Sequence, residues 1–224
     1  MSRNNIESSF NTLLFDIYMS IHLEYDNLHN LLNVSASLSD KQQSEIEEKV
    51  SKWNDNNPEH EYAGHEVFEN DIYKLLSYDK EINYAIFVLA FAKFEATLNK
   101  ICTLIGDEKG FTIRVFDISG KGIHRSRKYL EKMFLVNFSE LNSEWSRIVI
   151  YSELRNKIVH SYGEITIPDG VHVEETDALK KFKKLTGIGL TTDNFITIEN
   201  DTVKEFIFLS DKFLNDILDI LKEN

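Results

Sequence analysis

Apolar residues recur at three- and four-residue spacing over most of the chain, which is the pattern of amphipathic helices. The first helix is expected from about Ile6 to Leu32, and a more polar helix from Asp40 to Trp53 with Ser39 as its N-cap. Further helices are expected at Glu66–Ser77, Tyr84–Ile105, Ile123–Val136, Leu141–Tyr162, Glu174–Leu185 and Asp201–Leu221. The pattern therefore predicts a mainly α-helical bundle.

Segment Tyr84–Ile105 is the most apolar, with apolar residues nearly all round its helical wheel. Such a helix belongs at the centre of a bundle. Two other segments break the helical period. Residues from Gly106 to Gly122 are expected to include a short extended piece, and alternating residues from Gly187 to Ile198 predict a small β-hairpin before the last helix.

The formal net charge of −12 argues against a polyanionic partner, because nucleic acids are bound through Lys and Arg. The acidity is unevenly distributed, however. Residues 1–81 hold sixteen Asp and Glu against six Lys and Arg, whereas residues 109–160 hold ten basic and five acidic side chains. This distribution is compatible with a positive site on an acidic protein, and equally with ordinary solvated charge.

The cysteine content and the lengths of the apolar runs indicate the cellular location of the protein. The single cysteine, Cys102, excludes an internal disulfide and a cysteine-based zinc site. The N-terminus has no apolar stretch behind a basic end, and the longest apolar run, Tyr84 to Ala92, is nine residues, too short to span a bilayer. We therefore expect a cytoplasmic protein with no membrane partner.

The most informative chemical pattern is the octapeptide from Arg155 to Tyr162, which ends a predicted helix just before Gly163. Arginine is a permanent cation suited to phosphate, and histidine changes protonation near neutral pH. His160 can donate a proton to a leaving 5′ oxygen or, when neutral, accept one from a 2′ hydroxyl. Arg155 can stabilise charge that develops on the phosphate oxygens. The pattern indicates phosphodiester chemistry.

The helical period separates these two side chains. Arg155 and His160 point roughly 140° apart around the axis, with Asn156 beside His160 and Arg155 on the side of Tyr162. One helix therefore holds half of a site, which a second copy related by a twofold axis can complete. In the alternative, structural interpretation, Arg155 pairs with Glu153 or Glu164 on the surface and His160 caps the helix end.

The order Arg155, Asn156, three residues and His160 at the end of a helix resembles the motif of the HEPN superfamily, whose members are helical bundles and often ribonucleases. The segments Phe94–Asn99 and Asp117–Tyr129 also resemble parts of larger prokaryotic members. The resemblance covers about residues 80–220. It implies one domain, in which residues 1–80 form an acidic helical extension packed on an HEPN-like core at 81–224.

For function, the resemblance implies a metal-independent endoribonuclease whose catalytic residues are Arg155, Asn156 and His160. The implied substrate is RNA, the implied assembly is a homodimer with a composite active site, and the implied setting is a toxin or an antiphage growth-arrest effector. Tyr162 is similar in position to the tyrosine that a nucleotidyltransferase antitoxin adenylylates in HEPN toxins. The alternative is an inactive HEPN domain that binds RNA or a partner protein.

Other polar residues are candidates for supporting roles. Glu95 interrupts the apolar helix and needs a partner there, so it either supports the site or pairs with Lys100 or Arg155. Arg125, Lys128 and Lys132 share one side of a predicted helix and are candidate RNA contacts.

No metal or cofactor is expected. His60 and His65 are five residues apart, not the four of a zinc-protease helix. His22, Asp26 and His29 share a helical face, but the polar edge of an amphipathic helix explains them better. The chain has no glycine-rich phosphate loop followed by Lys and Ser or Thr.

Overall fold

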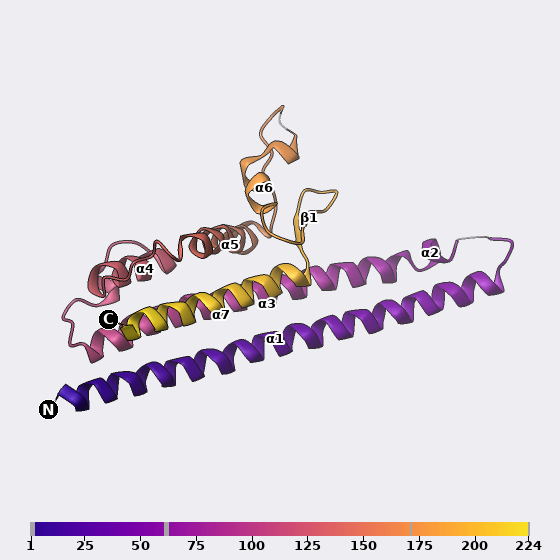
Figure 1. Ribbon diagram of the computed structural model, residues 1–224. Coiled ribbons are helices and arrows are strands. Elements are labelled where there is room, and N and C mark those ends of the chain that lie inside the picture. Colours follow the sequence, from indigo (N-terminus) through magenta and orange to yellow (C-terminus); the bar gives the residue numbers. More distant parts are fainter. Residues whose placement is uncertain (1–2, 61–62, 171, 224) are drawn as a thin grey trace.

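The computed structural model (Figure 1) describes residues 3–60, 63–170 and 172–223. These residues form a mainly α-helical structure with one small hairpin before the last helix, which confirms the predicted fold class. The helices are α1 (Arg3–Asn56), α2 (Gly64–Val67), α3 (Glu69–Glu108), α4 (Gly122–Met133), α5 (Asn142–Ser161), α6 (Asp177–Phe182) and α7 (Asn200–Glu223), with 3₁₀ turns at Val115–Asp117 and Val173–Glu175.

The first two predicted helices are one continuous helix, α1. Its buried stripe includes Phe10, Leu14, Ile17, Ile21, Leu28 and Leu32. The break that we expected at residues 33–39 is absent because this stretch contains no Gly or Pro to end the helix. Ser39 is not an N-cap; its Oγ donates to Asp79 Oδ2 of α3 at 2.7 Å.

Helix α3 likewise joins two predicted helices, because the polar residues 78–83 between them contain no helix breaker. The expected extended piece between Gly106 and Gly122 is wrong. The segment contains a 3₁₀ turn at Val115–Asp117, which is closed by a hydrogen bond from the Arg114 backbone N–H to Asp117 Oδ2 at 2.8 Å.

The long helices α1, α3 and α7 lie side by side, and α4 and α5 cover the side of α3 and α7 that faces away from α1 (Figure 1). Helix α3 contacts each of these elements, as its apolar circumference predicts. Its phenylalanines meet the α7 ring of Phe206, whose centroid is 5.4 Å from Phe87 and 5.5 Å from Phe91. One hydrophobic cluster thus joins the N-terminal, central and C-terminal helices.

The predicted hairpin is confirmed, with β1 (Ile188–Leu190) antiparallel to β2 (Ile196–Ile198). The chain just beyond α5 pairs next to it, because the Ile196 N–H donates to the Gly163 carbonyl at 2.9 Å. The end of α5 is therefore fixed against the hairpin. Within residues 3–60, 63–170 and 172–223, none of the helices combines the length and hydropathy that a membrane span requires.

Replacing Phe206 by Ala is expected to lower the free energy of unfolding by about 3–5 kcal/mol, because it removes a fully buried ring from the centre of the cluster. The matched control is Phe208→Ala, where the ring is 65% exposed and the expected change is below about 0.5 kcal/mol. Urea denaturation followed by circular dichroism measures both variants. Equal losses would contradict this orientation of α7.

Candidate functional site

Helix α5 ends at Ser161, and the next two residues both have left-handed backbone conformations, with φ of 53° at Tyr162 and 80° at Gly163. The Gly163 N–H donates to the Lys157 carbonyl at 3.1 Å, which closes the helix end. A Cβ at position 163 would overlap the Tyr84 hydroxyl, so only glycine fits there. The prediction that Gly163 terminates the helix is confirmed.

Arg155 is half-buried against α3. Its guanidinium carbon lies 5.8 Å from the centroid of the Phe91 ring, and its Nη1 donates to Asn156 Oδ1 at 3.0 Å. Its Nε is buried without a hydrogen-bond partner among the described residues. The structural alternative of a pair with Glu153 is not formed, because both oxygens of Glu153 accept from Lys181 Nζ at 2.6 Å. Because Nε is buried, an anion that approaches from solvent can bind only through the Nη groups of Arg155.

His160 and Asn156 are exposed in the last turns of the same helix. In the part of the chain that the structure describes, the His160 side chain takes part in no hydrogen bond or ion pair, and no such contact joins it to Arg155. The two residues of the motif therefore lie on one helix end without meeting. This agrees with the divergent directions that the helical period predicts.

Glu95 lies on α3, one turn after Phe91, and faces the start of α4. Its Oε1 is 3.1 Å from the place where a Cβ of Gly122 would be. A carboxylate at this position interacts favourably with the positive end of the α4 dipole. No ion pair with Lys100 or Arg155, the partners considered from sequence, occurs among the described residues. Glu95 thus lies close to the N-terminus of α4, one turn along α3 from the Phe91 ring that contacts Arg155 of α5.

The candidate RNA contacts lie on α4. Lys128 and Lys132 are exposed, and the Arg125 guanidinium carbon lies 4.7 Å from the centroid of the Phe116 ring, which is itself exposed. The structure leaves Arg125 Nε buried and unpaired among the described groups. This face of α4 presents cations next to an exposed aromatic ring.

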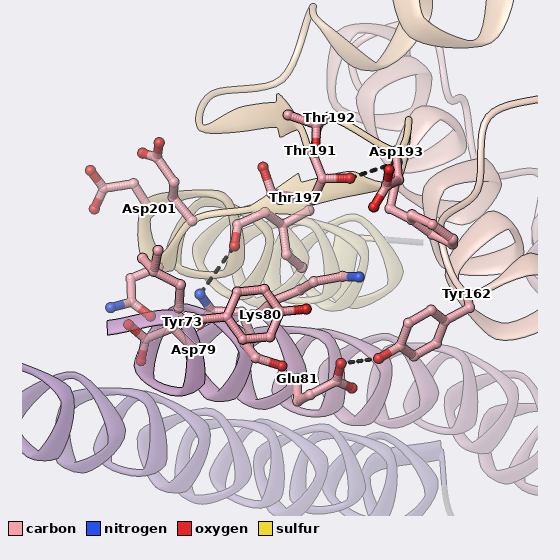
Figure 2. Close-up of a pocket in the computed structure, with 17 residues that line it drawn as sticks. Tyr73, Asp79, Lys80, Glu81, Tyr162, Thr191, Thr192, Asp193, Thr197 and Asp201 are labelled. Atoms are coloured by element: carbon pink, nitrogen blue, oxygen red, sulfur yellow. Dashed lines mark hydrogen bonds between the residues drawn. The ribbon is translucent and has the colours of Figure 1, made fainter. Parts of the chain in front are cut away.

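Tyr162 has a left-handed backbone conformation, and its side chain turns toward Glu81 of α3 (Figure 2). Among the described residues, no hydrogen bond or ring contact joins Tyr162 to Arg155. Its hydroxyl donates to Glu81 Oε1, and this hydrogen bond is the main cause that raises the pKa of Tyr162 above its ordinary value. The ring lies edge-on to Tyr84 and Phe195, with centroid distances of 6.0 and 6.1 Å. The Lys80 ammonium lies 4.4 Å from the Tyr162 ring centroid.

These contacts form one side of a groove of about 870 Å³, which we name the hairpin groove. It is bounded by residues 73–83 of α3, by Tyr162, and by residues 191–201 of the hairpin and the start of α7 (Figure 2). Sequence reasoning found Tyr162 but missed Lys80, Glu81 and Phe195. No sequence signal joins them, since the segments are far apart in the chain and meet only through the packing of β2 on α3.

The described residues contain no group of three or more His, Cys, Asp or Glu side chains that could hold a metal ion. His22 Nε2 lies 3.5 Å from Asp26 Oδ2 on the exposed face of α1. His60 and His65 are described, whereas residues 61 and 62 between them lie outside the described residues.

Comparisons with protein-family models, with curated proteins and with solved structures found no match to this chain.

Replacing Glu81 by Gln is expected to lower the pKa of Tyr162 toward the ordinary tyrosine value of about 10, because the carboxylate acceptor favours the protonated phenol. In the wild-type chain this hydrogen bond stabilises the folded state fully at pH values below the ordinary pKa of tyrosine. The stabilisation is lost as the pH rises through the raised pKa of Tyr162. Carbon-13 NMR of labelled tyrosine, assigned with Tyr162→Phe, measures the titration. Glu108→Gln at the far end of α3 serves as the control; a pKa unchanged by Glu81→Gln would refute the assignment.

Proposed function

We propose that this protein is a metal-independent endoribonuclease of HEPN type. The observation that carries the proposal is the end of α5, where Asn156 and the Phe91 ring hold the guanidinium of Arg155 and where the exposed His160 follows five residues later. His160 accepts the proton of a ribose 2′ hydroxyl, whose oxygen attacks the adjacent phosphorus. The bond to the 5′ oxygen breaks, that oxygen takes up a proton, and a 2′,3′-cyclic phosphate remains.

Arg155 stabilises the negative charge that builds on the phosphate oxygens during this attack. Asn156 accepts a hydrogen bond from Arg155 Nη1, so it orients the guanidinium from the solvent side while Phe91 supports it from the side of α3. The route requires RNA, because DNA lacks the 2′ hydroxyl that acts as nucleophile.

The active form that we propose is a homodimer. Arg155 and His160 diverge on one helix, so a second copy of the helix end supplies the missing partner. An apolar groove of about 540 Å³ between α1 and α3, lined by exposed residues including Leu31, Val34, Leu38, Tyr78, Ile82 and Leu89, supports an interface on this side. Glu81 lines this α1–α3 groove and also accepts the Tyr162 hydrogen bond. A second copy docked there would contact Glu81, the hydrogen-bond partner of Tyr162.

The RNA strand is proposed to run over α4, where Arg125, Lys128 and Lys132 meet its phosphates. The exposed Phe116 ring beside Arg125 suits stacking on an unpaired base. Glu95 faces the start of α4, and Phe91, one turn earlier on α3, contacts the guanidinium of Arg155. The same stretch of α3 therefore lies next to both α4 and Arg155.

The proposed setting is a toxin or an antiphage growth-arrest effector. In this setting a nucleotidyltransferase antitoxin transfers an adenylyl group from ATP to the Tyr162 oxygen, with release of pyrophosphate. The half-exposed Tyr162 ring makes the hydroxyl reachable, and the modification would replace its hydrogen bond to Glu81 with a negative charge next to that carboxylate.

A second candidate is an HEPN domain that binds RNA or a protein without cutting. It is favoured by the lack of any contact between Arg155 and His160 in the described structure. The cleavage assay below separates the two, since a binding module retains RNA yet leaves it intact.

Removing either motif residue is expected to lower RNA cleavage by at least about 100-fold, because proton transfer and charge stabilisation each supply that order of rate. His160→Ala and Arg155→Ala are compared with the wild type in the presence of chelator, and growth arrest on expression is scored in parallel. His172→Ala replaces another exposed histidine as the control. Variants as active as the wild type, or a wild type that neither cuts RNA nor arrests growth, would refute the enzyme.

The composite site predicts complementation. In an equilibrated mixture of Arg155→Ala and His160→Ala chains, half of the dimers are mixed and each mixed dimer has one intact site, so about a quarter of the wild-type activity should return. No recovery, with mixed dimers demonstrated by native mass spectrometry, would show that the two residues act within one chain.

A further inference from the structure

The hairpin groove already accommodates an alkylammonium group, namely the side chain of Lys80. Its Nζ lies 4.4 Å from the ring centroid of Tyr162, 4.9 Å from that of Phe195 and 5.4 Å from that of Tyr84. Three aromatic rings around one cation form an aromatic cage, which recognises ammonium groups through the negative faces of the rings. The groove is therefore chemically suited to aliphatic amines.

The rest of the groove is strongly acidic. Five carboxylate side chains line it against the single ammonium of Lys80: Asp79, Glu81, Asp193, Glu199 and Asp201. Two of them are engaged, since Asp79 accepts from Ser39 and Glu81 accepts from Tyr162. The three on the hairpin and at the start of α7 are exposed, and among the described residues their carboxylates have no hydrogen-bond or ion-pair partner.

Apolar surface lies between these charges. Tyr73 and Leu76 are exposed on α3 and line the groove together with the hairpin residues. The volume of about 870 Å³ is in the range of small-molecule sites. Carboxylates separated by apolar surface match amine groups separated by methylene chains.

Backbone groups of the hairpin beside the groove already have hydrogen-bond partners, so few remain to bind a peptide main chain. The Ile198 carbonyl accepts from Asn83 Nδ2 at 3.0 Å, the Ile196 carbonyl accepts from the Tyr84 hydroxyl, and the Phe195 N–H donates to Thr191 Oγ1 at 3.1 Å. An extended peptide gains affinity mainly through such groups. An occupant of this groove must instead be recognised through its charges and its aliphatic chain.

We propose that the hairpin groove binds a linear polyamine. Its ammonium groups pair with Asp193, Glu199 and Asp201, and its methylene chain lies on Tyr73 and Leu76. The cage that holds Lys80 is a further ammonium position, for which Lys80 competes. The bound amine lies against Tyr162, two residues beyond His160. Binding of the amine therefore affects the end of α5. Binding itself does not rest on the proposed ribonuclease activity.

Isothermal titration of the full chain with spermidine in 150 mM sodium chloride tests the site. One amine is expected to bind per chain, and the double variant Asp193→Asn, Asp201→Asn is expected to weaken binding by about tenfold, since it removes two exposed carboxylates without touching the core. Glu108→Gln removes an exposed carboxylate at the other end of α3 and should leave the affinity unchanged. Equal affinity of the double variant and the wild type would overturn the proposal.

Lys80→Met tests the cage independently, because it keeps an unbranched side chain out to Cε and removes the competing ammonium group. Spermidine is expected to bind about threefold to tenfold more tightly to this variant. A capped trilysine peptide, which carries the same charge on a peptide backbone, is expected to bind more weakly than spermidine. Unchanged affinity of Lys80→Met, or tighter binding of the peptide, would contradict a polyamine site in this groove.

Discussion

The structure depends on the burial of α3 among four other helices. Helices α1, α4, α5 and α7 all pack on it, and aromatic rings from α3, α5 and α7 meet in the core between them. One stripe of α3, which includes Ile82 and Leu89, stays exposed. Because its other faces are buried, α3 cannot rotate without exposing large apolar side chains to water. The end of α5 is positioned against α3: Phe91 supports Arg155, Tyr84 approaches Gly163, and Glu81 accepts the hydrogen bond of Tyr162.

The end of α5 presents three polar side chains in three directions. Arg155 packs inward on α3, His160 points to solvent, and the left-handed conformation of Tyr162 turns the phenol toward the hairpin groove. A non-glycine residue in this conformation costs about 1–2 kcal/mol, and such strain concentrates at functional sites. Arginine and histidine that diverge on one helix suit a site shared between two chains, and the tyrosine connects that site to a separate acidic groove.

Local sequence signals predicted most of the fold. Apolar periodicity located the central helix, the last helix and α5, and Gly163 marked where α5 ends. The two missed helix connections share one cause: residues 33–39 and 78–83 interrupt the apolar period, but a helix without Gly or Pro continues when long-range contacts such as Ser39 with Asp79 support it. The contacts of Tyr162 and Glu95 could not be predicted from the sequence, because helical spacing does not indicate which distant segment packs on a given face.

The proposed cleavage begins with attack by the ribose 2′ hydroxyl, and blocking that hydroxyl tests the proposal most directly. An RNA oligonucleotide and the same oligonucleotide with 2′-O-methyl groups throughout are incubated with the wild-type chain, and the products are weighed by mass spectrometry. The chemistry at His160 and Arg155 predicts fragments with 2′,3′-cyclic phosphate and 5′ hydroxyl ends from the unmodified strand, and an intact methylated strand. Cleavage of the methylated strand, or fragments with 5′ phosphate ends, would contradict it.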